Sequence, residues 1–490
     1  MRVATRWGTM VVNALMVSAL APAALGQEMQ MSKPEQGEHQ HAAASVVKPE
    51  YPRMGRAQER AQGALLTLER AEEIAAESNP TLRQADAEIR AAKARRQQAG
   101  LYPNPTLGYT GDEIRGGSVG GGKQGFFVQQ TLVTGGKLGL SREVYGNDLK
   151  LAEIEAEEQK IRVQSAVKMA FLRVLSAQEL LEARRDLAKI EQDGVETQRR
   201  LMNTGQTDET ELLAAEVEEQ RARMAARMQE NTLREEWRSL AAVIGQADLP
   251  LQTVAGDLEN GWPELNEEQA VEAVAKESPA IRIADAAQTR SQAVLGRAKR
   301  EAIPDVQMRG GMEYNHETLG SVPFAKGWEG IAELAVQIPV FNRNQGNVAA
   351  ARADAQRAEQ EKKRIALTLR ERAASVVDQY ANARLMALAY REEMLPRAKK
   401  AYELMLDKYG RMLASYPRVL DTQRKLYELQ MEYIGALESV WTNGIALQGY
   451  LLTDGLEAPA RPGEVDRPVR ETNVPMPERT TGPGEPMRNP

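Results

Sequence analysis

Along most of the chain, apolar positions recur at alternating steps of four and three residues. One series comprises Val163, Val167, Ala170, Val174, Ala177 and Leu181. A second comprises Leu369, Ala373, Val376, Tyr380, Ala383, Ala387, Tyr390 and Met394. This spacing is typical of helices that pack on one another along a narrow seam, and the frequent alanines let neighbouring helices come close. The pattern predicts a mainly α protein of long coiled-coil helical hairpins with a small β part.

The expected elements follow one plan that occurs twice. In the first copy we expect a helix over 68–101, strands over 105–115 and 125–134, a helix over 138–203, a turn near Gly205 and a further helix. In the second copy we expect a helix over 267–302, strands over 305–315 and 328–340, a helix over 346–409, a turn over 410–416 and a helix over 417–453. At ~1.5 Å per residue, the segment 138–203 would be roughly 100 Å long as a helix.

The two copies also share sequence. NPTLRQADAEI begins at Asn79 and SPAIRIADAAQ begins at Ser278, which is 199 residues later. This period is far longer than the ~20–50 residues of a solenoid repeat, so a whole structural unit is present twice. The two stretches mark the start of the shorter helix segments.

The short runs alternate between apolar and polar residues, as half-buried strands do. Val306, Met308 and Met312 share one face of the third run, and Arg309 and Glu313 share the other. Strands of about 9–11 residues with one apolar face are those of membrane barrels, and the alternative is a small soluble sheet that caps a helical bundle. Aromatic residues in or beside the runs could form the girdles of a barrel: Tyr109, Phe126, Phe127, Tyr314, Phe324, Trp328 and Phe341. Because four strands cannot close a barrel, several chains would have to share one.

Composition and the termini narrow the setting. The net charge of −6 is small and its signs are interleaved, so nothing favours binding to nucleic acid. The absence of cysteine excludes disulfides, thiolate metal sites and lipidation of an N-terminal cysteine. Residues 1–26 combine early arginines, an apolar stretch and small residues before Gln27, which is typical of a cleaved signal peptide, with a membrane anchor as the alternative. Polar residues 27–64 and proline-rich residues 454–490 are expected to be disordered.

With these features the chain resembles the TolC-like outer membrane efflux family, in particular its heavy-metal branch. The resemblance rests on the duplicated stretches, the prolines that open the strands, QIPVFNRNQG at 337–346 and YPRVLDTQRKL at 416–426. It covers a first repeat over 65–245, an equatorial linker over 246–264 and a second repeat over 265–453. It implies a homotrimer in which four transmembrane strands per chain form a 12-stranded barrel, above an α-helical tunnel that crosses the periplasm.

The resemblance also implies a function and partners. The chain would be the outer membrane duct of a tripartite efflux system in a Gram-negative bacterium, in contact with outer membrane lipid, a periplasmic adaptor and an inner-membrane RND-type pump. The cargo would be heavy-metal cations such as copper and silver, or zinc, cobalt and cadmium. The alternatives are a duct for drugs or other small molecules, and a periplasmic coiled-coil adaptor or scaffold. No enzyme and no cofactor is expected, because the residues offer no catalytic constellation.

Two candidate sites follow. In the family, the turn of the second repeat carries a tyrosine, a glycine and two aspartates that narrow the closed tunnel. Tyr409 and Asp421 match the tyrosine and the second aspartate, whereas Arg418 stands at the first aspartate and Met412 at the glycine. Arginines in a ring of carboxylates would change its field, so a simple anionic gate is in doubt, and an ordinary exposed Arg418–Asp421 pair is the alternative.

The second candidate site lies in the expected N-terminal arm. Thioethers and imidazoles there would suit copper or silver, and the alternative is a chance occurrence in a polar tail. The residues concerned are Met29, Met31, His39 and His41.

Overall fold

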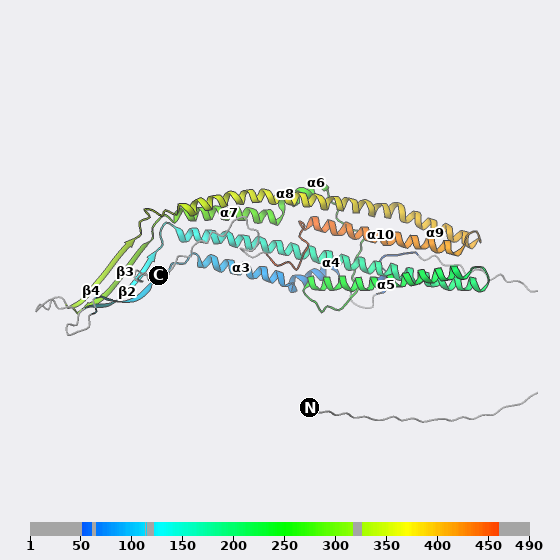
Figure 1. Cartoon of the computed structure of the whole chain (residues 1–490), viewed down its shortest axis with the longest axis horizontal. Coiled ribbons are helices and arrows are strands. Elements are labelled where there is room, and N and C mark those ends of the chain that lie inside the picture. The colour runs from blue at the N-terminus through cyan, green and yellow to red at the C-terminus, as the bar shows by residue number, and fades with distance from the viewer. Residues whose placement is uncertain (1–50, 61–64, 113, 115–121, 317–325, 460–490) are drawn as a thin grey trace, which may run out of the picture. The chain divides into compact units, whose positions relative to one another are not determined.

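The computed structural model describes residues 51–60, 65–112, 114, 122–316 and 326–459, all within the compact unit Pro49–Pro490. The signal peptide, most of both expected tails and the four metal-ligand candidates lie outside the described residues. Figure 1 shows the order of the elements. The first repeat contains α1 Arg56–Arg60, α2 Leu68–Ser78, α3 Pro80–Gln98, β1 Thr106–Asp112, β2 Lys123–Leu132, α4 Lys137–Asn203 and α5 Glu209–Ile244. The second contains α6 Glu267–Glu277, α7 Pro279–Arg300, β3 Val306–Asn315, β4 Gly327–Val336, α8 Gln345–Ala389, the π-turn η2 Tyr390–Met394, α9 Leu395–Gly410 and α10 Tyr416–Gln448.

The duplicated stretches each break a helix. The Asn79 side chain accepts a hydrogen bond from the Thr81 N–H at 2.9 Å and caps α3, whose first residue is proline. The Ser278 hydroxyl accepts from the Ala280 N–H at 3.2 Å and caps α7 in the same way. Since proline at the first helical position also opposes continuation of the preceding helix, the expected single helices over 68–101 and 267–302 are each two helices.

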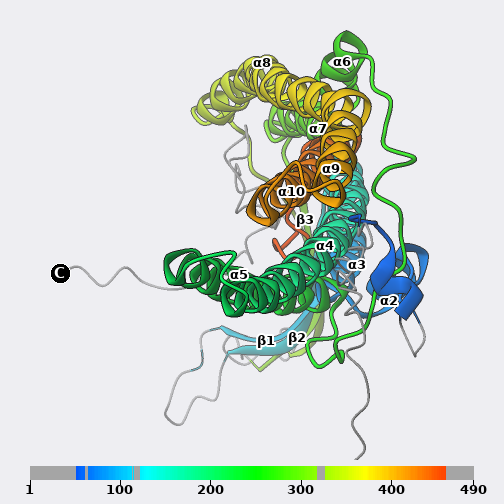
Figure 2. The same cartoon turned by 90° about the vertical axis from the view of Figure 1, so that its right-hand side faces the viewer.

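The long helices stand side by side as a wall (Figure 2). In one half of the wall, the helices that contact one another in sequence are α5, α4, α10 and α8. In the other half, which is nearer the sheet (Figure 1), they are α3, α4, α7 and α8. The helices α4 and α8 therefore run through both halves, and α3, α5 and α8 lie at the margins. The short helices α2 and α6 pack on α4 and α8, respectively.

The predicted seams largely form the core. All six residues of the first seam, from Val163 to Leu181, are buried. The second is buried at Ala373, Tyr380, Ala383 and Ala387, but Met394 is exposed. Leu395 instead packs against the core, because a turn of π-helix intervenes and rotates the residues that follow.

Proline explains that turn. Pro396 has no N–H to donate, and its ring would clash with the carbonyl of residue 392 in a regular α-helix. The chain forms η2 immediately before it. The single helix expected over 346–409 is therefore wrong at this point, since it ignores Pro396.

Between the repeats, the linker over 246–264 is fastened by one indole from each side. The Trp237 Nε1–H donates to the Leu249 carbonyl and the Trp441 Nε1–H to the Leu258 carbonyl, both at 2.9 Å. Val254 is fully buried and pairs with Leu66 in an isolated parallel bridge. The linker is thus part of the core surface rather than a loose connection.

The four strands form one antiparallel sheet in the order β1-β2-β3-β4. Chain order and sheet order coincide, so the two hairpins lie next to each other through β2 and β3. The last strand ends at Val336, earlier than the expected residue 340, because Pro339 cannot donate to a ladder. The first ends at Asp112 rather than 115.

Disorder was expected over 27–64 and 454–490, and this is wrong for the parts that the structure describes. Residues 51–60 include α1 and contact α4, and Met54 packs against the main core. Residues 454–459 lie against the Asn79 junction, where a side chain on Gly455 would come within 2.7 Å of the Ala166 Cβ. The polar composition of these segments predicted disorder wrongly, because a few residues such as Met54 and Gly455 contact the folded helices.

Candidate functional site: channel-forming surfaces

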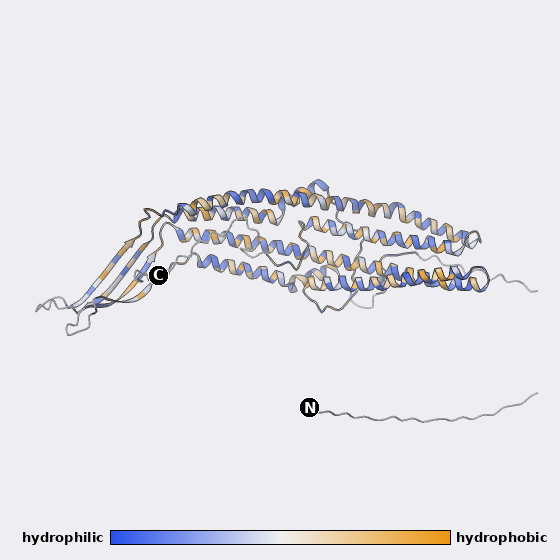
Figure 3. Cartoon of the chain, viewed as in Figure 1, coloured by the Kyte–Doolittle hydropathy of each residue, from blue (hydrophilic) through white to orange (hydrophobic). Residues whose placement is uncertain are grey.

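The sheet exposes the apolar residues of one face, whereas most residues of its polar face are half-buried, which is the reverse of a sheet that caps a soluble core. Partners across the ladder lie on the same face, for example Leu107 with Val128, Phe126 with Met312, and Met308 with Leu334. The exposed apolar side chains of this face are Leu107, Tyr109, Phe126, Val128, Leu132, Met308, Met312, Trp328, Leu334 and Val336. Figure 3 shows the alternation of hydropathy along the strands. Such a face is stable in lipid and not in water.

The other face of the sheet carries charge. Lys123 Nζ lies 2.6 Å from Glu329 Oε2 and 3.7 Å from Glu313 Oε1. The Asn315 amide donates to the second oxygen of Glu329 at 2.8 Å. Glu313 and Asn315 are buried although they belong to the polar face. This face can border water within a channel, because its charges are paired across the strands.

Most of the described aromatic residues expected to form a girdle lie on the exposed apolar face of the sheet. Tyr109 meets Phe126 with their ring centroids 5.9 Å apart, and Tyr314 meets Trp328 at 5.5 Å, both edge to face. Phe127 does not belong to this group: its ring lies on the polar face with the Arg309 guanidinium 4.0 Å from its centroid. Phe126 and Phe127 are neighbours in a strand, so they cannot share a face. Phe324 lies outside the described residues.

Both the sheet and the helical wall have open margins. In the described chain, β1 and β4 each pair on one side only. At the helical margin formed by α5, four apolar residues spaced like a seam are exposed, namely Leu213, Val217, Met224 and Met228. Leu367 and Leu385 are exposed on α8, which lies at the opposite margin. The described part of the chain leaves these margins uncovered.

The turn between α9 and α10 gathers the three predicted gate residues. Tyr409 is half-buried against the Tyr416 ring, whose centroid is 5.6 Å away. Arg418 and Asp421 are exposed in the first turns of α10. Asp421 pairs with Lys425 at 2.8 Å, one helical turn along, rather than with Arg418, the partner that the alternative interpretation gave it. The turn thus presents Arg418 and the Asp421–Lys425 pair to solvent.

Met412 adopts a backbone conformation that suits glycine. Its φ is +61°, in the left-handed region, and 88% of its surface is exposed. Its N–H donates to the Tyr409 carbonyl at 2.9 Å and closes the turn. The glycine that the family resemblance implied at this position therefore has a physical reason, and methionine is strained there.

A buried ion pair near this turn was missed from the sequence. Glu191 on α4 accepts from Arg424 on α10 at 2.9 Å and is only 3% exposed. Burial raises the pKa of the Glu191 carboxyl above its ordinary value, although the Arg424 charge opposes this. The pair joins the hairpins of the two repeats. The neighbours of Glu191 along α4 are themselves mostly polar, so the sequence did not single it out.

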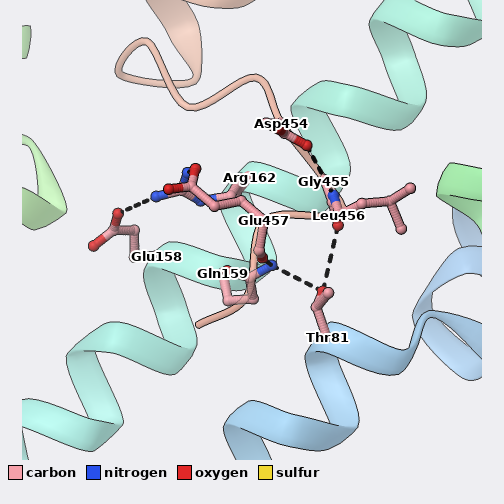
Figure 4. Close-up of polar contacts among 8 residues, drawn as sticks. All are labelled: Thr81, Glu158, Gln159, Arg162, Asp454, Gly455, Leu456 and Glu457. Atoms are coloured by element: carbon pink, nitrogen blue, oxygen red, sulfur yellow. Dashed lines mark hydrogen bonds and ion pairs between the residues drawn. The ribbon is translucent and has the colours of Figure 1, made fainter. Parts of the chain in front are cut away.

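At the middle of the wall, the C-terminal residues are fixed by polar groups (Figure 4). The Gln159 amide donates to the Thr81 hydroxyl at 2.8 Å and to the Glu457 carbonyl at 3.1 Å. The Thr81 hydroxyl lies 3.4 Å from the Gly455 carbonyl oxygen, and the Glu457 carboxylate pairs with Arg162. Residues 455–457 thereby contact both α3 and α4.

Within the described ranges, no three histidine, aspartate or glutamate side chains are grouped so that they could hold a metal ion. The predicted ligands Met29, Met31, His39 and His41 lie outside these ranges. In the described part of the chain, we find no helix whose length and apolar character would let it cross a membrane.

Comparison with known proteins gives consistent matches. Residues 71–246 and 270–451 match the model of a family described as outer membrane efflux protein. A curated relative is the cobalt-zinc-cadmium resistance protein CzcC of Cupriavidus metallidurans, 25% identical over 374 residues that cover 76% of this chain and 86% of the relative.

Solved structures are similar in fold. A crystal structure of CusC, described in terms of folding and transmembrane channel formation, superposes with a TM-score of 0.65 at 18% identity and covers 84% of this chain and 99% of the other. The open state of the Neisseria gonorrhoeae MtrE outer membrane channel gives a TM-score of 0.62 at 16% identity, over 80% of this chain and 90% of the other. At these identities the structural likeness shows the fold alone.

Proposed function

Since the chain belongs to the outer membrane efflux protein family, we propose that three copies form the exit duct of a tripartite system that expels heavy-metal cations. The observation that carries this proposal is the sheet with an exposed apolar face and two open edges. Unpaired backbone groups cost several kcal/mol each in lipid, so the edges of β1 and β4 must meet strands of other copies. Three copies supply twelve strands, an even number within the range of membrane barrels.

The helical margins support the same assembly. The exposed seam on α5 of one copy would pack against α8 or α9 of the next, as apolar stripes do in coiled coils. Each repeat contributes one strand hairpin and one helical hairpin, so three chains give a tube with approximate sixfold symmetry. A periplasmic adaptor and an inner-membrane RND-type pump would complete the system at the turns of the hairpins.

At the periplasmic mouth, Tyr409, Arg418 and Asp421 are the proposed gate. Three copies would place three such turns around the tunnel axis. The exposure of Arg418 beside the Asp421–Lys425 pair supports a mouth of mixed charge rather than an anionic ring.

For the cargo, the relative CzcC is named for resistance to cobalt, zinc and cadmium, and this favours divalent metal cations here. A duct for drugs or other small molecules is the second candidate, because the fold is shared by channels such as MtrE. The adaptor or scaffold alternative is excluded by the family match, which spans both repeats.

The test is a gene deletion in the native host. Loss of the protein should lower tolerance to cobalt, zinc and cadmium and raise the cell content of these metals, measured by mass spectrometry. Copper, silver and a panel of drugs serve as the comparison. Unchanged tolerance to every metal with increased drug sensitivity would replace the metal proposal by the second candidate.

A metal-collecting role of the N-terminal arm is a separate proposal. Deletion of residues 29–41 would remove Met29, Met31, His39 and His41. Soft thioether and imidazole ligands favour copper or silver. Reduced tolerance to these two ions with normal assembly would support it, and unchanged tolerance would reject it.

A further inference from the structure

The segment Tyr51–Arg60 lies against the first helical hairpin. The Gly55 N–H donates to Glu179 Oε2 at 2.9 Å, and the Arg56 guanidinium pairs with the Asp186 carboxylate. Both acceptors belong to α4. The Arg56–Asp186 pair is largely shielded, with side chains 21% and 14% exposed, so it is stronger than an ordinary surface pair. One end of the segment is thus fixed on the first repeat.

The other end of the segment reaches the second repeat. The Tyr51 hydroxyl donates to Glu403 Oε1 at 3.3 Å, and its ring stands edge-on to Tyr402 with the centroids 6.0 Å apart. The Lys399 ammonium lies 4.6 Å from the centroid of the Tyr51 ring. All three partners belong to α9. A further bond from Arg56 Nη2 to the Tyr51 carbonyl at 3.0 Å joins the two ends of the segment.

This bridge adds a link between α4 and α9 to the packing of Tyr409 against the cluster that contains Ile190 of α4. The main contacts of α9 are with α10 and η2, and α10 in turn packs on α4. Tyr51–Arg60 spans from α4 to α9 directly. Because α9 ends at Gly410 and leads into the turn that carries Tyr409 and Met412, a constraint on α9 also constrains that turn.

We propose that Tyr51–Arg60 is a clasp that holds α9 against the first hairpin and restrains local opening of α9 and of the turn that follows it. The proposal rests on the proposed function for its consequence, which is the width of the channel mouth. Its contacts suit a reversible device, since apart from the partly buried Met54 they are single hydrogen bonds, one ion pair and aromatic contacts at a partly hydrated surface. A segment that merely covered apolar surface would not need a partner on each of two hairpins.

The first experiment measures amide hydrogen exchange of the purified full-length protein in mild detergent. The variant Tyr51→Ala with Arg56→Ala removes both anchors, and Arg53→Ala, an exposed arginine of the same segment, is the matched control. We expect amides of α9 to exchange about tenfold faster in the double variant, with α3 unchanged, because local opening of α9 becomes easier. Equal exchange of α9 in wild type, control and double variant would overturn the proposal, whether or not the protein conducts ions.

A gentler pair of variants guards against misfolding. Asp186→Asn and Glu403→Gln keep the shapes of the two acceptors and remove their charges, one on each hairpin. Each should accelerate exchange in α9, and Asp186→Asn should do so although it lies on α4. If Asp186→Asn accelerates exchange in α4 alone and leaves α9 unchanged, the contacts are local packing and the clasp is overturned. In planar bilayers, the clasp variants should show a larger resting conductance, whereas a protein that forms no channel at all would contradict the proposed function instead.

Discussion

At the scale of single residues, the left-handed backbone conformation of Met412 destabilises the turn between α9 and α10. A non-glycine residue in the left-handed region lowers the stability of the folded state by roughly 1–2 kcal/mol. Glycine avoids this cost, but it also makes the unfolded chain more flexible, which offsets part of the gain. Met412→Gly should therefore raise the free energy of unfolding by about 0.5 kcal/mol. Denaturant titration of the purified protein measures this. Leu413→Gly is the control, since Leu413 is also largely exposed, and it should destabilise. Equal effects of both variants would contradict the argument.

Two of the proposed gate residues, Arg418 and Asp421, are tested by their combined removal. Arg418→Ala with Asp421→Ala takes away the exposed guanidinium and the partner of Lys425. We expect the resting single-channel conductance in planar bilayers to rise about twofold, because charged groups at a constriction set its field and its width. Lys425→Ala breaks the same pair but leaves both gate residues. If that control reproduces the effect, Arg418 has no part in the gate.

Some of these residues could be predicted from the sequence and others could not. Tyr409 and Asp421 were found because they match a family pattern. Glu191 was not found, because nothing in a sequence reveals that Arg424, in another repeat, reaches it. The pairing of Asp421 with Lys425 was available from their spacing of one helical turn and was overlooked in favour of Arg418.

At the scale of elements, spacing predicted the helices well and their interruptions poorly. The seam from Val163 to Leu181 is buried as expected because a strict spacing fixes one face of a helix. After η2 the face changes, and the seam spacing gave no sign of the change even though Pro396 stood in the sequence. Alternation likewise predicted all four strands, but their ends depended on prolines and on loops.

One element, α4, carries a buried acid that makes stability depend on pH. Burial raises the pKa of the Glu179 carboxyl to about 6, and the nearby charges of Glu182, Glu259 and Asp257 act in the same direction, while the Gly55 N–H opposes them. The folded state therefore binds the proton more tightly than the unfolded state, whose carboxyl has its ordinary value of 4.5. Stability is gained as the pH falls through about 6 and is complete below the unfolded value.

We expect protonation of Glu179 to make the free energy of unfolding larger at pH 4.5 than at pH 7.5, by up to about 2 kcal/mol. Glu179→Gln should remove this part of the pH dependence and stabilise the protein at pH 7.5. Thermal melting of both proteins across this pH range is the measurement. Glu153→Gln, an exposed residue of the same helix, should leave the profile unchanged; a shift as large as that of Glu179→Gln would refute the assignment.

At the scale of the whole molecule, the sheet distinguishes a membrane protein from a soluble one. Leu334 and Ala335 are neighbours in β4 on opposite faces, with Leu334 69% exposed. Leu334→Arg should weaken insertion, since arginine on the lipid face costs ~2–4 kcal/mol at mid-depth and less towards the strand ends, whereas Ala335→Arg on the polar face should be tolerated. Outer membrane fractionation and resistance of the assembly to unfolding in detergent report on both. The opposite order of severity would indicate a sheet that caps a soluble bundle.

The order of the strands also determines when the sheet can form. Pairing within each hairpin is local, but Leu132 meets Val306 only after the whole first hairpin of helices and the linker have been traversed. Contacts between such distant residues form slowly, because the closure of the long intervening loop costs entropy before any contact is gained. The helices can therefore fold and associate while β2 and β3 are still apart. The lipid-facing surface would then be completed last, at the bilayer, and a newly exported chain would spend little of its time in water with that surface assembled.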